Sequence, residues 1–199
     1  GKQSKGLHLH STFAVTSSGL PLGVLRAECT ARGQRSQEDD SPLSAIPIEE
    51  KNTFSWIQGV RDCMDIKLLM PHTSLVCVMD READFFEIFD DQRRKSSRVD
   101  LLVRAQHNRK TMGENKLFEE VMQSPIQSRI TIKIPRQSAR VKKKNQKARS
   151  KRAARIAEVT VRYIRTELKP PPYFKEMPPI SLWIIHVKEE KPPAGTQAV

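Results

Sequence analysis

The sequence predicts a mixed α/β fold, and three patterns carry that prediction. Residues 75–79 form an uninterrupted apolar run after a turn-rich segment, which is typical of a strand buried on both faces. Phe85, Ile88 and Phe89 then recur at helical spacing, so a helix is expected to begin where that strand ends. Residues 7–16 instead alternate apolar and polar side chains, as half-buried strands do.

The N-terminal part of the chain predicts an antiparallel hairpin. The alternating strand at residues 7–16 is followed by a turn at residues 17–19 and by a second strand that runs towards residue 29. His8 and His10 share one strand face, a pattern that metal ligands also show. No third ligand is near in the sequence, so a solvated or partner-facing pair is the favoured interpretation.

A loop and a helix are expected next. Residues 30–51 mix glycine, proline and serine with charges, which is typical of a surface loop. A polar cap at residue 52 or 53 then precedes Trp56, Val60 and Met64, which follow at intervals of four. This spacing predicts a helix that faces the core, and Trp56 is assigned to packing.

Two apolar strands are each followed by a charged residue. Asp80 follows residues 75–79, and Arg104 follows a second apolar run at residues 99–103. If the two strands run parallel through the intervening helix, their ends meet at one edge of the sheet, where open α/β sheets place their chemistry. An anion bound to a metal at Asp80 would then reach Arg104.

The second half of the chain has a different pattern. A short helix is expected at residues 117–122, and alternating strands at residues 130–134 and 159–163 precede an apolar strand at residues 182–187. These strands predict a small, separate antiparallel sheet. The basic link between them, residues 139–155, has few apolar side chains, so a mobile loop is expected when no polyanion is bound.

Positive charge is concentrated in one segment. The net charge is +12, and no Asp or Glu falls between Arg129 and Ala157. Twelve cations lie there: Arg129, Lys133, Arg136, Arg140, Lys142, Lys143, Lys144, Lys147, Arg149, Lys151, Arg152 and Arg155. A polyanionic partner is the natural inference, and contact with DNA phosphates is favoured over a solvated loop or a localisation-like patch.

Cysteine content and the chain's N-terminal residues suggest where the protein resides. Cys29, Cys63 and Cys77 are odd in number and lack metal-ligand spacing, which favours a reduced, cytoplasmic protein. No apolar run reaches membrane-spanning length, so no membrane partner is expected. The first ten residues are too polar for a signal peptide and soon enter a strand, so the chain is expected to begin inside a larger protein.

The charged string that begins at Asp80 is the sharpest functional signal. A carboxylate fixed at the end of a buried strand can bind Mg²⁺ or Mn²⁺, and with two further carboxylates it can hold a metal pair for attack on a phosphodiester. The alternative is that Asp80 or Asp84 only caps the following helix while Arg81 and Glu82 form surface ion pairs. Spacing alone leaves both interpretations open.

Two stretches carry a family resemblance. Residues 78–89 read VMDREADFFEIF and residues 101–110 read LLVRAQHNRK. These stretches resemble bacterial cut-and-paste DDE transposases of the insertion-sequence-four group. The resemblance implies an RNase H-like mixed sheet flanked by helices, with an inserted antiparallel β-subdomain, and it implies that Asp80 is the second carboxylate of an Asp, Asp, Glu triad.

The resemblance also implies further site residues. Arg104, His107, Arg109 and Lys110 match a basic motif that touches transposon-end DNA, whereas Gln106 and Asn108 depart from it. Trp183 matches a tryptophan that stacks on a base flipped from the DNA end, although a core strand residue is an equal alternative. The basic loop would clamp the DNA backbone through Lys142, Lys143, Lys144, Lys147, Arg149, Lys151 and Arg152.

The other two triad carboxylates are not found. The first belongs on a strand before Leu7, and no Tyr, Arg, Glu, Lys pattern surrounds Tyr163 or Tyr173. Both are expected to lie outside this chain. The implied division is a partial catalytic core at residues 1–112, the inserted subdomain at 113–191 and a tail at 192–199.

The functional prediction is the central fragment of a DNA transposase that is inactive in isolation. The parent protein would hydrolyse phosphodiester bonds and transfer strands with Mg²⁺ or Mn²⁺, as a homodimer on transposon ends and target DNA, without a small-molecule substrate. It would reside in the bacterial cytoplasm, associated with the nucleoid. The alternatives are a non-catalytic DNA-binding or assembly module from a degenerate transposase, and an RNase H-like nuclease of another kind.

Overall fold

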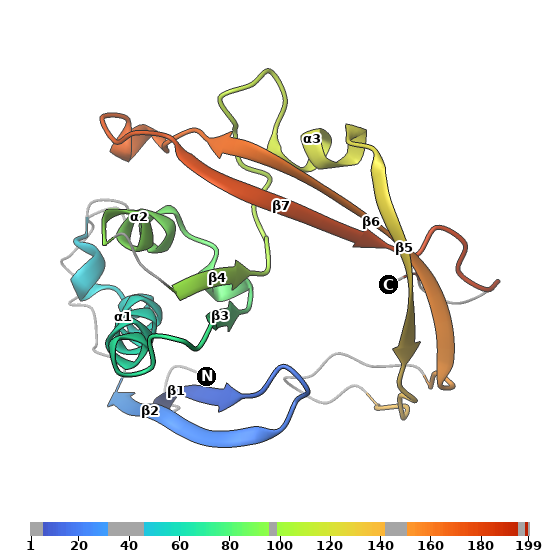
Figure 1. Cartoon of the computed structure of the whole chain (residues 1–199), viewed down its shortest axis with the longest axis horizontal. Helices are drawn as coiled ribbons and strands as arrows, with labels where there is room; N and C mark the ends of the chain where they lie inside the picture. The colour runs from blue at the N-terminus through green and yellow to red at the C-terminus, as the bar shows by residue number, and fades with distance from the viewer. Residues whose placement is uncertain (1–5, 32–45, 96–98, 142–150, 195–197, 199) are drawn as a thin grey trace. The chain divides into compact units, whose positions relative to one another are not determined.

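The computed structural model describes residues 6–31, 46–95, 99–141, 151–194 and 198 of the chain. This part is a mixed α/β structure with three α-helices and three small sheets (Figure 1). It forms two compact units, Gly1–His107 with Pro170–Glu176, and Asn108–Lys169 with Met177–Val199. The division at residues 112 and 113 stays a prediction. Within the described ranges, no helix has both the length and the apolar character needed to cross a bilayer.

The first unit begins with the predicted hairpin. Strands β1 (Leu7–Val15) and β2 (Pro21–Ala31) pair antiparallel, and Gly19 adopts a positive φ of 86° in the turn between them. The polar face of this hairpin, not the apolar one, meets helix α1 (Phe54–Leu69). The His10 ring contacts the Trp56 ring edge-on at 4.6 Å between centroids, and Arg26 donates to Asp62 at 2.8 Å.

The opposite face of the hairpin is exposed. Its large apolar side chains are all more than half accessible to solvent: Leu7, Leu9, Phe13, Val15, Leu22 and Val24. Helix α1 approaches the other face closely, since a Cβ added at Gly59 would lie 3.0 Å from Thr12 Oγ1. The absence of a side chain at Gly59 therefore sets the spacing between α1 and β1.

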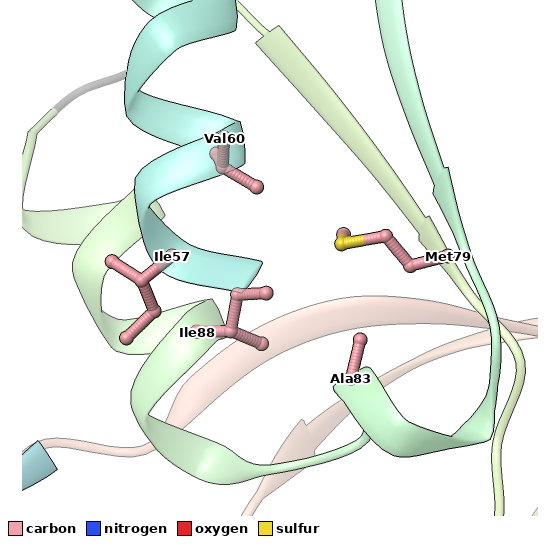
Figure 2. Close-up of a cluster of buried hydrophobic side chains, with 5 residues drawn as sticks. All are labelled: Ile57, Val60, Met79, Ala83 and Ile88. Atoms are coloured by element: carbon pink, nitrogen blue, oxygen red, sulfur yellow. The ribbon is translucent and has the colours of Figure 1, made fainter. Parts of the chain in front are cut away.

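The core of the first unit lies between α1 and a parallel strand pair. Strands β3 (Leu75–Met79) and β4 (Val99–Val103) pair in parallel, and helix α2 (Phe86–Arg94) connects them. Figure 2 shows the buried cluster, to which α1, β3, the short 3-10 helix Arg81–Ala83 and α2 all contribute. Its members are Ile57, Val60, Met79, Ala83 and Ile88. Trp56 packs against this cluster, which confirms its assignment to packing.

The prediction that residues 75–79 are buried on both faces is wrong. Val76 is 53% exposed and Val78 is 72% exposed, whereas Met79 is buried. Helix α1 contacts β3 on one face, and the exposure of Val76 and Val78 leaves the other face open. An apolar run shows that a strand suits a buried environment, but not which of its faces this chain covers.

The second unit contains the predicted antiparallel sheet. Its strands β5 (Ile126–Ile134), β6 (Arg155–Leu168) and β7 (Ile180–Lys188) lie in the order β5-β6-β7. Helix α3 (Leu117–Gln123) contacts β6 and β7. Glu120 of α3 accepts a hydrogen bond from Thr166 at 2.5 Å, which places the helix on the Thr166 face of the sheet.

Two valines distinguish the covered side of the first unit from the open side. Replacing Val60, which is 2% exposed, with alanine should lower the free energy of unfolding by about 2 kcal/mol, because it removes buried methyl groups and leaves a cavity. The matched change Val78→Ala should cost less than about 0.5 kcal/mol. Urea unfolding followed by Trp56 fluorescence in a Trp183→Phe background measures both. Equal losses would show that β3 is buried on both faces after all.

Candidate functional site

Asp80 and Arg104 lie at the same edge of the β3–β4 sheet. Met79 is in register with Val103, and the Arg104 N–H donates to the Met79 carbonyl at 3.0 Å, so the ladder continues one step beyond the strands. Both side chains are exposed. The parallel arrangement on which the sequence argument depended is therefore confirmed, and the two charged residues follow the carboxyl ends of neighbouring strands (Figure 1).

The Asp80 carboxylate has a local structural role. Its Oδ1 accepts the Glu82 N–H at 2.9 Å and caps the 3-10 helix Arg81–Ala83. Helix α2 begins only at Phe86, so the expected direct passage from strand to helix is wrong, and one turn of 3-10 helix separates the two. Asp80 therefore acts as a helix cap, as the alternative interpretation predicted, but it caps the 3-10 helix and not α2. A cap does not exclude a second role for an exposed carboxylate.

Asp84 is the residue that the sequence argument undervalued. It is 7% exposed, and its Oδ2 accepts the backbone N–H groups of Gln106 at 2.7 Å and His107 at 2.8 Å. The carboxylate therefore holds the segment after β4 against the turn after β3, the two segments that carry Arg104 and Asp80. Its position before an apolar helix suggested only a cap, because its partners lie more than twenty residues away in the chain.

The predicted basic motif is divided between the two units. Arg104 and His107 are exposed in the first unit, whereas Arg109 and Lys110 belong to the second. Asn108, which departs from the family motif, accepts the Phe118 N–H at 2.9 Å and so helps to cap α3. The motif position occupied by Asn108 is therefore used for structure in this chain.

The residues that the structure describes do not by themselves make a metal-pair site. Asp80 is the predicted ligand for Mg²⁺ or Mn²⁺, but no group of three or more His, Cys, Asp or Glu in the described ranges is arranged to hold a metal ion. A metal pair needs several oxygen ligands, since Mg²⁺ prefers octahedral coordination by carboxylates, substrate phosphates and water. The described part of the chain supplies one candidate carboxylate at the sheet edge.

The basic segment is partly neutralised by the fold. Five of its predicted DNA ligands, Lys142, Lys143, Lys144, Lys147 and Arg149, lie outside the described residues. Lys151 is exposed, and Arg152 exchanges backbone hydrogen bonds with Gln137 at 2.8 and 2.9 Å. Arg155 forms a bidentate ion pair with the buried carboxylate of Glu189, with an Nη2 to Oε2 distance of 2.7 Å. These hydrogen bonds raise the pKa of Arg155 and make it a structural cation.

Trp183 lies on the surface of the second unit. It is 61% exposed on β7, so its interpretation as a core residue is wrong. The Tyr163 ring of β6 meets it edge-on, with 5.8 Å between centroids and 69° between planes. The DNA role of Trp183 stays a prediction. In the sequence, Tyr163 is visible only as one residue of an alternating strand. Its contact with Trp183 could be found only from the register of β6 and β7.

Comparison with models of known protein families and with curated proteins found no match to the chain.

Asp84 and Asp80 can be distinguished by substitution. Asp84→Ala should lower the free energy of unfolding by about 2–4 kcal/mol, because two backbone N–H groups lose a charged acceptor. Amide exchange at Gln106 and His107 should accelerate in the same variant. Asp80→Ala removes a cap, so it should cost about 1 kcal/mol and leave those two amides protected. Unchanged exchange in Asp84→Ala would contradict this role.

Proposed function

We propose that the chain is the central part of a cut-and-paste DNA transposase of the insertion-sequence-four group. The observation that carries the proposal is the position of Asp80 and Arg104 after neighbouring parallel strands, within the stretches VMDREADFFEIF and LLVRAQHNRK. In the parent protein, Asp80 is one of three carboxylates that bind Mg²⁺ or Mn²⁺, and Arg104 neutralises phosphate charge beside it. The reaction class is phosphodiester hydrolysis at transposon ends followed by strand transfer.

The proposal includes an RNase H-like sheet in the first unit. Its support is the distribution of apolar surface: α1 contacts β1, β3 and β4, while the apolar residues of the hairpin and of β3 on the other side are exposed. Large apolar patches left exposed on a protein surface mark interaction sites. In the proposed fold, further elements of the parent protein cover it, and a strand with the first carboxylate joins the two sheets.

The second unit is proposed as the inserted subdomain that holds DNA. Its support is the concentration of cations around β5 and β6, where Arg129, Lys133, Arg136 and Arg140 are exposed; the lysine-rich segment follows Arg140 in the sequence. Cations of this kind bind phosphates without reading sequence. In this proposal Trp183 stacks on a base extruded from the transposon end, and its exposure supports that role.

A second candidate is a non-catalytic DNA-binding or assembly module from a degenerate transposase. The observation that favours it is the use of the Asp80 carboxylate as a cap, together with the lack of a metal-holding group among the residues that the structure describes. Both candidates bind DNA, so DNA affinity does not separate them. Activity of the protein encoded by the complete reading frame does.

The DNA-binding part of the proposal predicts a strong salt dependence. Affinity of the 199-residue chain for duplex DNA should fall steeply as salt rises, and replacing Lys142, Lys143 and Lys144 with glutamine should reduce the slope of log K against log salt by roughly one per lysine. A control with the same loss of charge replaces Lys95, Lys175 and Lys191 and should keep the slope. Fluorescence anisotropy measures both. A flat salt response would rule out the basic clamp.

The catalytic part of the proposal predicts that Asp80→Asn abolishes strand transfer. Asparagine retains a side-chain oxygen that can accept the Glu82 N–H, so the fold should survive while the anionic metal ligand is lost. The assay uses the protein from the complete reading frame with Mn²⁺, and Glu82→Gln is the control that should remain active. Full activity of Asp80→Asn would eliminate the triad assignment, and an inactive wild type that still binds DNA would favour the second candidate.

A further inference from the structure

The open face of the β5-β6-β7 sheet carries an exposed aromatic pair. Tyr163 is 43% exposed and Trp183 is 61% exposed, and their rings lie edge-on at 5.8 Å between centroids. Helix α3 occupies the other face, where Ile184, between Trp183 and Ile185 in sequence, is buried. The aromatic pair is thus on the face that this helix does not cover.

A cation lies beside the aromatic pair. Arg165 is the register partner of Trp183 across β6 and β7, and it is exposed on the same face. Its Nε donates to Ser181 Oγ at 3.0 Å, which orients the guanidinium along the surface. Two exposed apolar side chains lie on the same face: Ile185, the register partner of Tyr163, and Val187.

We propose that Tyr163, Trp183 and Arg165 form a binding site for two unpaired nucleotides. Each ring stacks on one base, and Arg165 binds the phosphate that accompanies them. This inference rests on the proposed function for its ligand, DNA, and it adds Tyr163 and Arg165 to the single stacking residue proposed there. The site takes the unpaired nucleotides of a frayed or nicked DNA end.

The ring geometry distinguishes unpaired nucleotides from a duplex. The two ring planes differ by 69°, so bases that stack on both rings cannot be parallel to one another. Neighbouring bases of a duplex are parallel and stacked, so a duplex does not fit both rings without losing its stacking. Sheet surfaces with exposed aromatics are a known platform for single strands, and their stacking tolerates any base. The net charge of +12 favours a polyanion such as a nucleic acid over a neutral or basic protein partner.

The test uses a fluorescent oligothymidylate and the 199-residue chain. Tyr163→Leu and Trp183→Leu should each weaken single-strand binding roughly ten-fold in an anisotropy titration, because each removes one stacked base. Tyr163→Phe should retain wild-type affinity, since stacking needs the ring and not the hydroxyl. Tyr173→Leu, which removes the other tyrosine of the chain, should also bind as wild type.

Duplex binding separates this inference from the proposed function. Tyr163→Leu should leave duplex affinity unchanged, whereas the lysine-to-glutamine variant should weaken duplex binding. Wild-type single-strand affinity in Tyr163→Leu would overturn the site even if the salt-dependent duplex binding is observed. Light scattering is the second measurement: a wild-type dimer that Tyr163→Leu converts to a monomer, without a change in single-strand affinity, would assign this face to self-association and overturn the inference.

Discussion

The buried carboxylate of Asp84 is the constraint on which the predicted site depends. It accepts two backbone N–H groups, from Gln106 and His107, and so fixes the segment after β4 to the turn after β3. A buried carboxylate needs such donors, because removing it from water without partners is costly. Strand pairing alone places Asp80 and Arg104 at one sheet edge, and this interaction holds the chain that follows Arg104 in place.

The first unit has a polar interior contact where an apolar one would be expected. The hairpin turns His10 and Arg26 towards α1 and exposes its leucines, and β3 likewise exposes Val76 and Val78. Burial lowers the pKa of His10, which fits its position against Trp56. Both strand pairs thus present apolar faces away from the helix that contacts them. This arrangement is what the proposed transposase core would need, since other elements of a larger sheet domain could cover both faces.

The positions of the elements could be read from the sequence more readily than their surroundings. The hairpin, the helix with Trp56, the two apolar strands and the antiparallel sheet follow from local periodicity, and the structure contains all of them. The partners of Arg155 and Asp84 could not be predicted, because Glu189 and Gln106 are distant in the chain. Twelve cations in one segment predicted a polyanionic partner, and the sequence did not show that the fold pairs one of them, Arg155, with a buried carboxylate.

The sequence by itself determined the mixed α/β class, the charged residues that follow two apolar strands, and the concentration of positive charge in one segment, because these depend on local periodicity and composition. The parallel pairing of β3 and β4 came only from the structure. Tertiary structure decided which faces are open and which charged groups are paired. Trp183 shows the difference: an aromatic residue in a strand suits a core or a binding surface equally well, and only the position of α3 on the opposite face leaves it exposed beside Tyr163.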